Sequence, residues 1–336
     1  MKKRWTEIVA VMAVSAGVLA GCGKEEKKSE IKENQENESA VEEATEQMGY
    51  TSVEIPENPE RIVDLSGNSD ILSILGYSVV GTANSDAYDY TRFPSYLEHT
   101  LEGAEILGYS MQDTMDIEGI LKLEPDLIII SNVQEKMYEQ LQQIAPTVMV
   151  ELEQIDWRED IRAFAEIFGK EDVAEQWLSD YEAKAAEAGV EIKTVYGEDA
   201  TYFAMLASGG QLFVFDAAGI GSVLYDDMGL KKPENMPVQE NISLPVINYE
   251  GLAEIDADYM VVVGTDEDLE SLRANDIYQS LRAVEAGNVA ELPASPYFNI
   301  GYSCIGKTVF LDEFSSLMAQ QVEGIPQIAE PAQTEE

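Results

Sequence analysis

Apolar and polar residues alternate along the first half of the chain as they do in a protein built from strands and helices. Short apolar runs, bounded by polar residues, Gly or Pro, predict buried strands. These runs lie at 61–65, 78–83, 105–108, 126–131 and 147–152. Helical spacing follows the first of them, at 66–76, and returns at about 134–144. Because strands and helices alternate, the pattern predicts a mainly parallel sheet that is covered on both faces.

The pattern changes to a helical period from Trp157 to about Lys193. This segment is rich in Ala, Glu and Lys, and Gly169 is expected to divide it into two helices. The second helix, from about 170 to 188, would be roughly 28 Å long at 1.5 Å per residue. A helix of that length can connect two domains.

The second half returns to strands. Two strand-like runs at 201–206 and 211–215 flank a Gly-containing turn and predict an antiparallel hairpin. A helix is expected at 221–230, strands at 259–264 and 288–292, and a closing amphipathic helix at 306–322. The predicted fold is therefore α/β, with two Rossmann-like lobes of mainly parallel sheets joined by a single long inter-lobe α-helix.

One short pattern occurs twice. "DIEGILKLEPDLIII" (116–130) and "NYEGLAEIDADYMVV" (248–262) are displaced by 132 residues and share three identities. Asp116 and Asn248 are both good helix N-caps, and Pro125 cannot continue a helix. The repeat is either an equivalent device in each lobe or a chance recurrence, because helix-then-strand units are common in α/β proteins.

The first residues read as an export signal. Lys2, Lys3 and Arg4 precede an apolar stretch at 8–19, which is shorter than the about 20 residues that a membrane span needs. "LAGC", ending at Cys22, resembles the lipobox of bacterial lipoproteins, which implies cleavage before Cys22, acylation of its thiol and a membrane tether. The alternative is a plain signal peptide with an incidental cysteine.

These patterns divide the chain into six parts. They are a signal peptide (1–21), the lipidated Cys22 with a disordered acidic tether (22–49), an N-terminal lobe (50–156), a helical connector (157–193), a C-terminal lobe (194–323) and a flexible tail (324–336).

Charge and residue counts exclude several classes of function. The 336 residues carry a net charge of −43, with 64 acidic residues against 21 basic ones, so nucleic acid would be repelled. The single histidine, His99, rules out a metal site with several imidazoles in one chain. Cys304 reads as a buried thiol, and no G-x-S-x-G or phosphate-binding Gly-rich motif is present, so we expect no enzyme, no cofactor and no directly bound metal.

An ordered set of segments resembles a known family. "PERIVDLSGNSDILSILGYSVVGTAN" (59–84), "ILKLEPDLIIIS" (120–131) and "LPVINYEGLAEIDADYMVVV" (244–263) resemble the periplasmic binding proteins that serve ABC importers of iron siderophores, haem and cobalamin. "YSCIGKTVFLDEF" (302–314) is similar to the end of Gram-positive siderophore receptors. The resemblance spans about 53–318.

The resemblance implies a fold and a role. Two lobes joined by a rigid helix would hold the ligand in the cleft between them, outside the membrane, and the monomeric receptor would deliver it to a permease dimer. Glu118 and Glu250 match by motif position the glutamates that meet permease arginines in this family. The alternative is that each glutamate merely suits the N-terminus of its helix.

Ligands of open α/β sheets gather beyond the carboxyl ends of the strands, which selects the candidate contacts. They are Asn68, Ser69, Tyr88, Tyr90, Arg92, Tyr109, Ser131, Trp157, Ser208, Gln211, Tyr297, Phe298 and Tyr302. Arg92 would either donate hydrogen bonds to the oxygens around a ferric ion or balance Asp86 and Asp89 on the surface.

The candidate contacts are mostly aromatic and neutral, with few basic residues. Anionic ferric catecholates or ferric citrate would need several Arg or Lys, so the expected ligand is a ferric chelate of the hydroxamate type. Haem and cobalamin are the alternatives within the same transporter class. A surface lipoprotein without a transport role is the alternative outside it.

Overall fold

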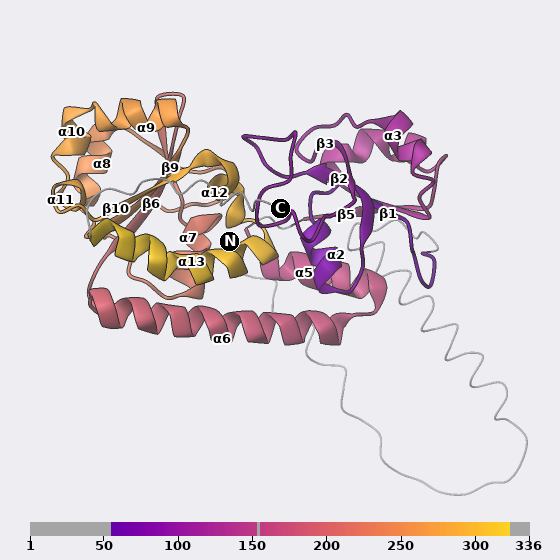
Figure 1. The fold of residues 1–336 in the computed structure, drawn as a ribbon, viewed down its shortest axis with the longest axis horizontal. Coiled ribbons are helices and arrows are strands. Elements are labelled where there is room, and N and C mark those ends of the chain that lie inside the picture. Colours follow the sequence, from indigo (N-terminus) through magenta and orange to yellow (C-terminus); the bar gives the residue numbers. More distant parts are fainter. Residues whose placement is uncertain (1–54, 153–154, 323–336) are drawn as a thin grey trace, which may run out of the picture. The chain divides into compact units, whose positions relative to one another are not determined.

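The computed structural model describes residues 55–152 and 155–322. The described residues belong to one compact unit, which contains two lobes with one sheet each (Figure 1). The predictions for residues 1–49 and 324–336 fall outside the described residues. Within the described ranges, no helix is both long enough and apolar enough to cross a membrane.

The first lobe is built on five parallel strands in the order β3-β2-β1-β4-β5. The strands are β1 (Ile62–Asp64), β2 (Val79–Asn84), β3 (Glu105–Tyr109), β4 (Leu127–Ser131) and β5 (Thr147–Val150). The helices are α2 (Ser69–Ile74), α3 (Ile117–Lys122), the 3₁₀ helix η1 (Asn132–Met137) and α4 (Tyr138–Leu141). All five predicted strands are confirmed, but the single helix predicted at about 134–144 is a 3₁₀ segment followed by one short α-helical turn.

Strand β4 shows why this sheet is buried on both faces. Leu127 and Ile129 point into a core that reaches the second lobe, whereas Ile128 and Ile130 point into a smaller core on the opposite face. All four side chains have no exposed surface. This is the two-residue period of a strand covered from both sides.

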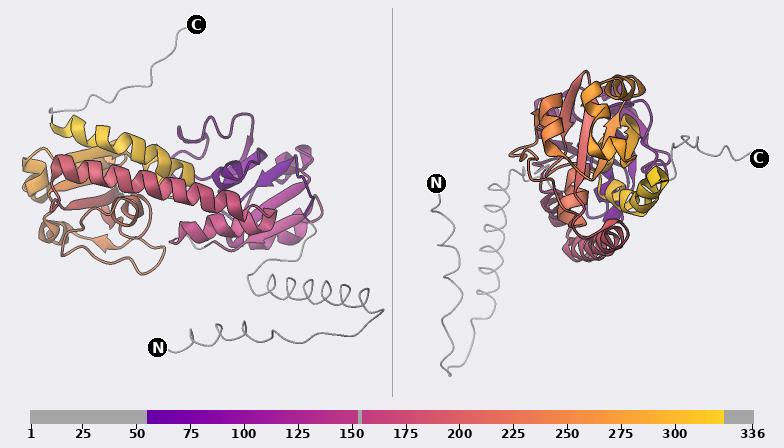
Figure 2. Two further views of the ribbon diagram at one scale, coloured as in Figure 1. Left: turned by 90° about the horizontal axis from the view of Figure 1, so that it is seen from below. Right: turned by 90° about the vertical axis from the view of Figure 1, so that its left-hand side faces the viewer.

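Two helices join the lobes. Helix α5 (Trp157–Phe168) ends at Gly169, which adopts the left-handed conformation with a φ of 60°, and α6 (Glu171–Tyr196) follows. At 26 residues, α6 is longer than predicted and spans about 39 Å. It runs along both lobes beside the closing helix α13 (Cys304–Val322) (Figure 2).

The second sheet is mixed, in the order β10-β9-β6-β7-β8. Its strands are β6 (Tyr202–Ser208), β7 (Gln211–Val214), β8 (Val246–Ile247), β9 (Tyr259–Gly264) and β10 (Val289–Pro293). Strands β6, β9 and β10 are parallel, and the predicted β6–β7 hairpin is antiparallel. The helices are α7 (Ile220–Ser222), the π-helix η2 (Val223–Asp227), α8 (Tyr249–Ile255), α9 (Asp266–Arg273), α10 (Asp276–Gln279), α11 (Arg282–Glu285) and α12 (Ala294–Ile300).

The two copies of the repeated pattern have the same local structure at their start. Asp116 caps α3 by accepting a hydrogen bond from the backbone N–H of Gly119 at 3.0 Å. Asn248 caps α8 in the same way through the N–H of Gly251 at 2.8 Å. One helix belongs to each lobe (Figure 1).

The two copies also end alike. Asp126 accepts the N–H of Arg61 at 3.0 Å, and Asp258 accepts the N–H of Thr201 at 2.8 Å. Arg61 and Thr201 each stand directly before the central strand of their lobe, β1 or β6. The repeat is therefore the same local structure in both lobes, and not a chance similarity of sequence.

Candidate ligand-binding cavity

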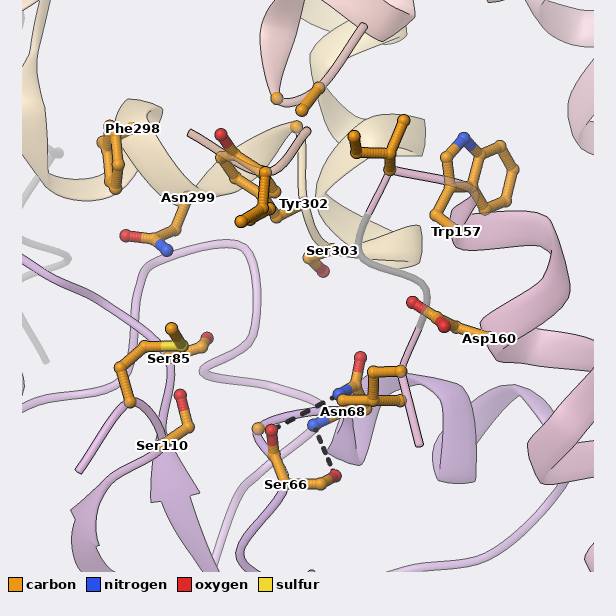
Figure 3. A pocket seen from close by; sticks show the side chains of 18 of the residues that line it. Ser66, Asn68, Ser85, Ser110, Trp157, Asp160, Phe298, Asn299, Tyr302 and Ser303 are labelled. Carbon is orange, nitrogen blue, oxygen red and sulfur yellow. Dashed lines mark hydrogen bonds between the residues drawn. The ribbon is translucent and has the colours of Figure 1, made fainter. Parts of the chain in front are cut away.

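A cavity of about 370 Å³ lies where the two lobes face each other. Its first-lobe wall comes mainly from the loops after β1, β2 and β3. Its second-lobe wall comes from residues near α7, from the segment before β8, and from α12 with the turn that follows it. Residues from the start of α5 complete it (Figure 3). Its size is within the about 300–1,000 Å³ that is usual for small-molecule sites.

The lining is mostly apolar or neutral. The first lobe supplies short polar side chains, and the second supplies the rings of Phe298 and Tyr302 with the amide of Asn299. Among the described lining residues, Asp160 is the one with a charged side chain, and none is Lys or Arg. Such a surface suits a neutral or cationic ligand with a large apolar body.

A buried carboxylate holds the loop after β1 in place. Asp64 accepts hydrogen bonds from the hydroxyls of Ser66 and Ser69, both at 2.6 Å, and from the backbone N–H of Asn68 at 3.1 Å. Burial raises the pKa of Asp64, although these hydrogen bonds act in the opposite direction. Ser66 and Asn68 thus reach the cavity, while Ser69 turns inward and contacts Thr82 at 2.7 Å.

The aromatic wall belongs to the second lobe but is supported from both. The ring of Phe298 lies 5.9 Å from that of Tyr302 and 5.5 Å from that of Tyr88, which belongs to the first lobe. The hydroxyl of Tyr88 also donates to Ser208 at 3.1 Å. Burial raises the pKa of Tyr302, so its phenol remains protonated at neutral pH.

Hydrogen bonds tie the lobes together beside the cavity. Asp70, at the start of α2, accepts the hydroxyl of Ser303 at 2.7 Å and the N–H of Ile305 at 3.3 Å. It therefore acts as an N-terminal anion for α13, a helix of the other lobe. A second bond between the lobes joins the loop after β2 to α12, where Asp86 accepts the hydroxyl of Ser295 at 2.6 Å.

A buried ion cluster lies next to the ring of Trp157, which lines the cavity. The ammonium of Lys307, 1% exposed, donates to the hydroxyl of Ser222 and to Asp227, and lies 4.9 Å from the Trp157 ring centre. Asp227 also accepts from Arg158 at 2.8 Å and from Tyr181 at 2.7 Å. Burial lowers the pKa of Lys307, and Asp227 opposes that shift.

Five of the predicted contact residues line this cavity. They are Asn68, Tyr109, Trp157, Phe298 and Tyr302. Tyr88, Tyr90 and Ser208 are not part of the lining. The hydroxyl of Tyr88 joins the lobes through Ser208, and the ring of Tyr90 lies 6.1 Å from that of Tyr109. That any of these side chains contacts the ligand stays a prediction.

The other predicted contacts lie outside the lining, and most of them have a local partner. Ser69 is bonded to Asp64, and Ser131 forms a capping box with Gln134 at the start of η1. Tyr297 donates to Glu313 at 3.0 Å, and Gln211 is exposed at the hairpin turn.

Arg92 also lies outside the lining. Its side chain is 75% exposed and forms an ion pair with Asp89 at 2.7 Å. The hydroxyl of Thr91 and the Arg92 guanidinium lower the pKa of Asp89. Of the two roles considered for Arg92, this placement agrees with balancing surface carboxylates.

Several lining residues were not among the predicted contacts. Asp160 follows Trp157 by one helical turn, so the spacing i, i+3 could have pointed to it once Trp157 was placed at the cleft. Asn299 and Ser303 lie among the rings already selected near 297–302. Ser222 falls within a segment predicted as an ordinary helix, and no sequence signal marks it.

Comparisons with known proteins agree with this architecture. A family model described as periplasmic binding protein matches residues 69–296. The iron(3+)-hydroxamate-binding protein FhuD of Bacillus subtilis (strain 168) is 30% identical over 323 residues, which cover 93% of this chain and 97% of that protein. The iron(3+)-hydroxamate-binding protein YxeB of the same organism is 30% identical over 262 residues, covering 74% and 78%.

Solved structures show the same fold. A FhuD fold-family periplasmic binding protein component of a Fep/Fec-like ferrichrome ABC transporter from Bacillus subtilis matches with a TM-score of 0.68 at 27% identity, covering 80% of this chain and 97% of that one. Unliganded FhuD2 from Staphylococcus aureus matches with a TM-score of 0.67 at 23% identity, covering 78% and 99%.

Proposed function

This chain belongs to the periplasmic binding protein family, and from that premise we propose that it is the extracytoplasmic substrate-binding component of an ABC importer for ferric siderophores of the hydroxamate type. In this role it binds and delivers its cargo and catalyses no reaction. Two relatives that match most of the chain are named as iron(3+)-hydroxamate-binding proteins, which supports the choice of ligand.

The observation that carries the proposal is the charge of the cavity. Its described lining contains no Lys or Arg and one carboxylate, Asp160. Ferric tris-catecholates and ferric citrate are anions, and burying them here would leave their charge unpaired, which is costly. A ferric trihydroxamate is neutral or cationic, and its hydrocarbon linkers can pack against Phe298 and Tyr302.

A ligand panel tests this proposal. Trp157 lines the cavity and is 6% exposed, so a bound iron chelate should quench its fluorescence. The protein is titrated with a ferric trihydroxamate, a ferric tris-catecholate, ferric citrate, haem and cobalamin. We expect the trihydroxamate to bind most tightly.

The other possible results of the ligand panel would change the assignment of the ligand or of the function. Tighter binding of haem or cobalamin would reassign the cargo within the same transporter class. If no member of the panel quenches fluorescence or raises the melting temperature, a surface lipoprotein without a transport role becomes the better assignment, because any ligand of the folded state stabilises it.

We further propose that the protein is held at the outer face of the cell membrane by a lipid on Cys22. This residue lies outside the described part of the chain, so the proposal rests on the lipobox-like sequence before it. A Cys22→Ala protein is expected to appear in the medium or soluble fraction, while the parent remains with membranes. Equal membrane retention of the two would contradict lipid anchoring.

Docking to the permease is proposed to use Glu118 and Glu250. Both are exposed in the first turn of their helices and occupy equivalent positions of the repeat. A permease dimer with twofold symmetry would meet two matching acidic points, one on each lobe.

A further inference from the structure

The loop after β2, residues 85–92, reaches from the first lobe onto the second. The buried carboxylate of Asp86 accepts the hydroxyl of Ser295 at 2.6 Å. The backbone N–H of the next residue, Ala87, donates to the side-chain oxygen of Asn299 at 2.9 Å. Ser295 and Asn299 both belong to α12, so two consecutive residues of the loop are bonded to one helix of the other lobe.

Tyr88 gives the loop a further attachment. Its hydroxyl donates to Ser208, at the end of β6, at 3.1 Å, and its ring packs edge-to-face with that of Phe298 at 5.5 Å. Ser85, Phe298 and Asn299 line the cavity. Figure 3 shows Ser85 on the first-lobe side of the cavity, facing Phe298 and Asn299 on the second-lobe side. The attached loop therefore borders the cavity.

Bonds within the first lobe give the loop its shape. The second carboxylate oxygen of Asp86 accepts the N–H groups of Tyr88 at 2.9 Å and Asp89 at 3.1 Å. The side-chain amide of Asn84 donates to the carbonyl oxygens of Asp89 and Arg92. None of these bonds involves the second lobe, so the loop can leave α12 and β6 as a unit without losing them.

The attachments are strong enough to hold the loop and weak enough to be reversible. When the loop detaches, water replaces each lost partner, so a neutral hydrogen bond favours the attached state by only about 2- to 10-fold. The bond to Asp86 contributes more because its acceptor is a carboxylate, which is 1% exposed while the loop is attached.

We propose that residues 85–92 form a strap, which must detach from α12 and β6 before a ligand enters or leaves the cavity. The strap is attached in both the free and the loaded protein and detaches transiently. It therefore controls the rates of ligand exchange rather than the affinity. This inference rests on the proposed function, since it concerns the exchange of that ligand.

A double variant on the second lobe tests the strap. Ser208→Ala, Ser295→Ala removes two of the attachments and leaves the sequence of the strap unchanged. Association and dissociation of ferric desferrioxamine B, a linear trihydroxamate complex, are followed in the full-length protein by the fluorescence of Trp157. We expect both rates to rise about tenfold or more, with the affinity within about threefold of the parent. A change in ligand contacts would instead act mainly on dissociation, and so on affinity.

A control variant and a measurement without ligand complete the test. Ser271→Ala, Ser280→Ala makes the same changes at exposed positions of the second lobe outside the cavity lining, and both rates should stay as in the parent. Amide hydrogen exchange at Ala87 reports strap detachment directly, because this N–H donates to Asn299. It should be about tenfold faster in the Ser208→Ala, Ser295→Ala protein than in the parent.

The possible results separate the strap from the proposed function. If this variant exchanges ligand at the rates of the parent, the strap is refuted and the proposed function stands. The same conclusion follows if dissociation alone accelerates and the affinity falls in proportion. If the parent does not bind the complex, the hydroxamate assignment fails and amide exchange decides on the strap. Equal exchange at Ala87 in parent and variant would then refute it.

Discussion

At the scale of single residues, buried carboxylates organise this molecule. Asp64 shapes a cavity loop, Asp70 joins α2 to the start of α13, and Asp227 neutralises Lys307. Each is held by several hydrogen bonds, as a buried charge requires. Burial raises the pKa of both Asp64 and Asp70, so charging them in the folded chain is unfavourable.

The raised pKa of the Asp70 carboxyl should make the stability of the protein depend on pH. Burial raises the pKa of this carboxyl in the folded chain above the ordinary value of 3.8. A raised pKa contributes stability that is fully present below 3.8 and lost as the pH rises through the folded-state value. The unfolding free energy of the parent should therefore fall relative to that of Asp70→Asn as the pH rises above 3.8. Urea unfolding at several pH values measures this, and a constant difference would contradict it.

Breaking the ion pair between Asp227 and Lys307 should cause a large loss of stability. Asp227→Asn removes the counter-ion of Lys307 and leaves a buried ammonium without a charged partner. We expect the free energy of unfolding to fall by about 3 kcal/mol, as is typical when one member of a buried pair is removed. Asp226→Asn, the same change at the exposed neighbouring position, should cost less than about 0.5 kcal/mol. Similar losses for the two variants in chemical denaturation would show that the pairing has little effect.

Part of the site was predictable residue by residue. Asn68 and Tyr109 follow parallel strands, and the rule that ligands gather at the carboxyl ends of strands finds them. Asp160 and Ser222 lie on helices that face the cavity, and this rule does not reach them. For Arg92 the sequence offered Asp86 and Asp89 as surface partners, and the structure selects Asp89.

At the scale of elements, the predicted strands were recovered better than the predicted helices. Continuous apolar runs mark buried strands clearly, whereas the short helices α9 to α12 have too few turns for a clear period. Helix α6 was predicted to end at about residue 188, but it continues to Tyr196. In the structure Gly189 continues the helix, and a Cβ there would lie 2.0 Å from the carbonyl oxygen of Met228.

This contact reverses the usual effect of a glycine in a helix. Gly→Ala within a helix normally stabilises by up to about 1 kcal/mol. Gly189→Ala should instead destabilise by about 2 kcal/mol, because the added methyl collides with backbone that cannot easily move. Ala183→Gly, on the exposed side of α6, is the control and should cost about 1 kcal/mol. Thermal unfolding of both variants measures the effect, and stabilisation by Gly189→Ala would refute the close approach.

At the scale of the whole molecule, the repeat places an exposed glutamate at an equivalent position on each lobe. Glu118 and Glu250 follow their N-caps by two residues in both copies. Neither glutamate belongs to the cavity lining. The proposed docking role therefore predicts that mutation can separate capture from delivery.

Removing both glutamates should stop delivery without affecting capture. The double variant Glu118→Ala, Glu250→Ala is expected to lower siderophore uptake by cells at least about tenfold, since interfacial charge pairs contribute strongly to docking. Its affinity for the ligand should stay within about twofold, because distant sites act independently. The control is Glu187→Ala, Glu191→Ala on the exposed side of α6. Weakened ligand binding in the first variant would overturn the docking role.

The larger core runs without a break from the sheet of the first lobe, through α5 and α6, to α13 in the second. Neither half can lose its tertiary structure without uncovering apolar side chains of the other. The pair should therefore unfold cooperatively, as one calorimetric transition in which the van't Hoff and calorimetric enthalpies agree. For a receptor that works outside the cell, this leaves proteases no half-open intermediate to attack.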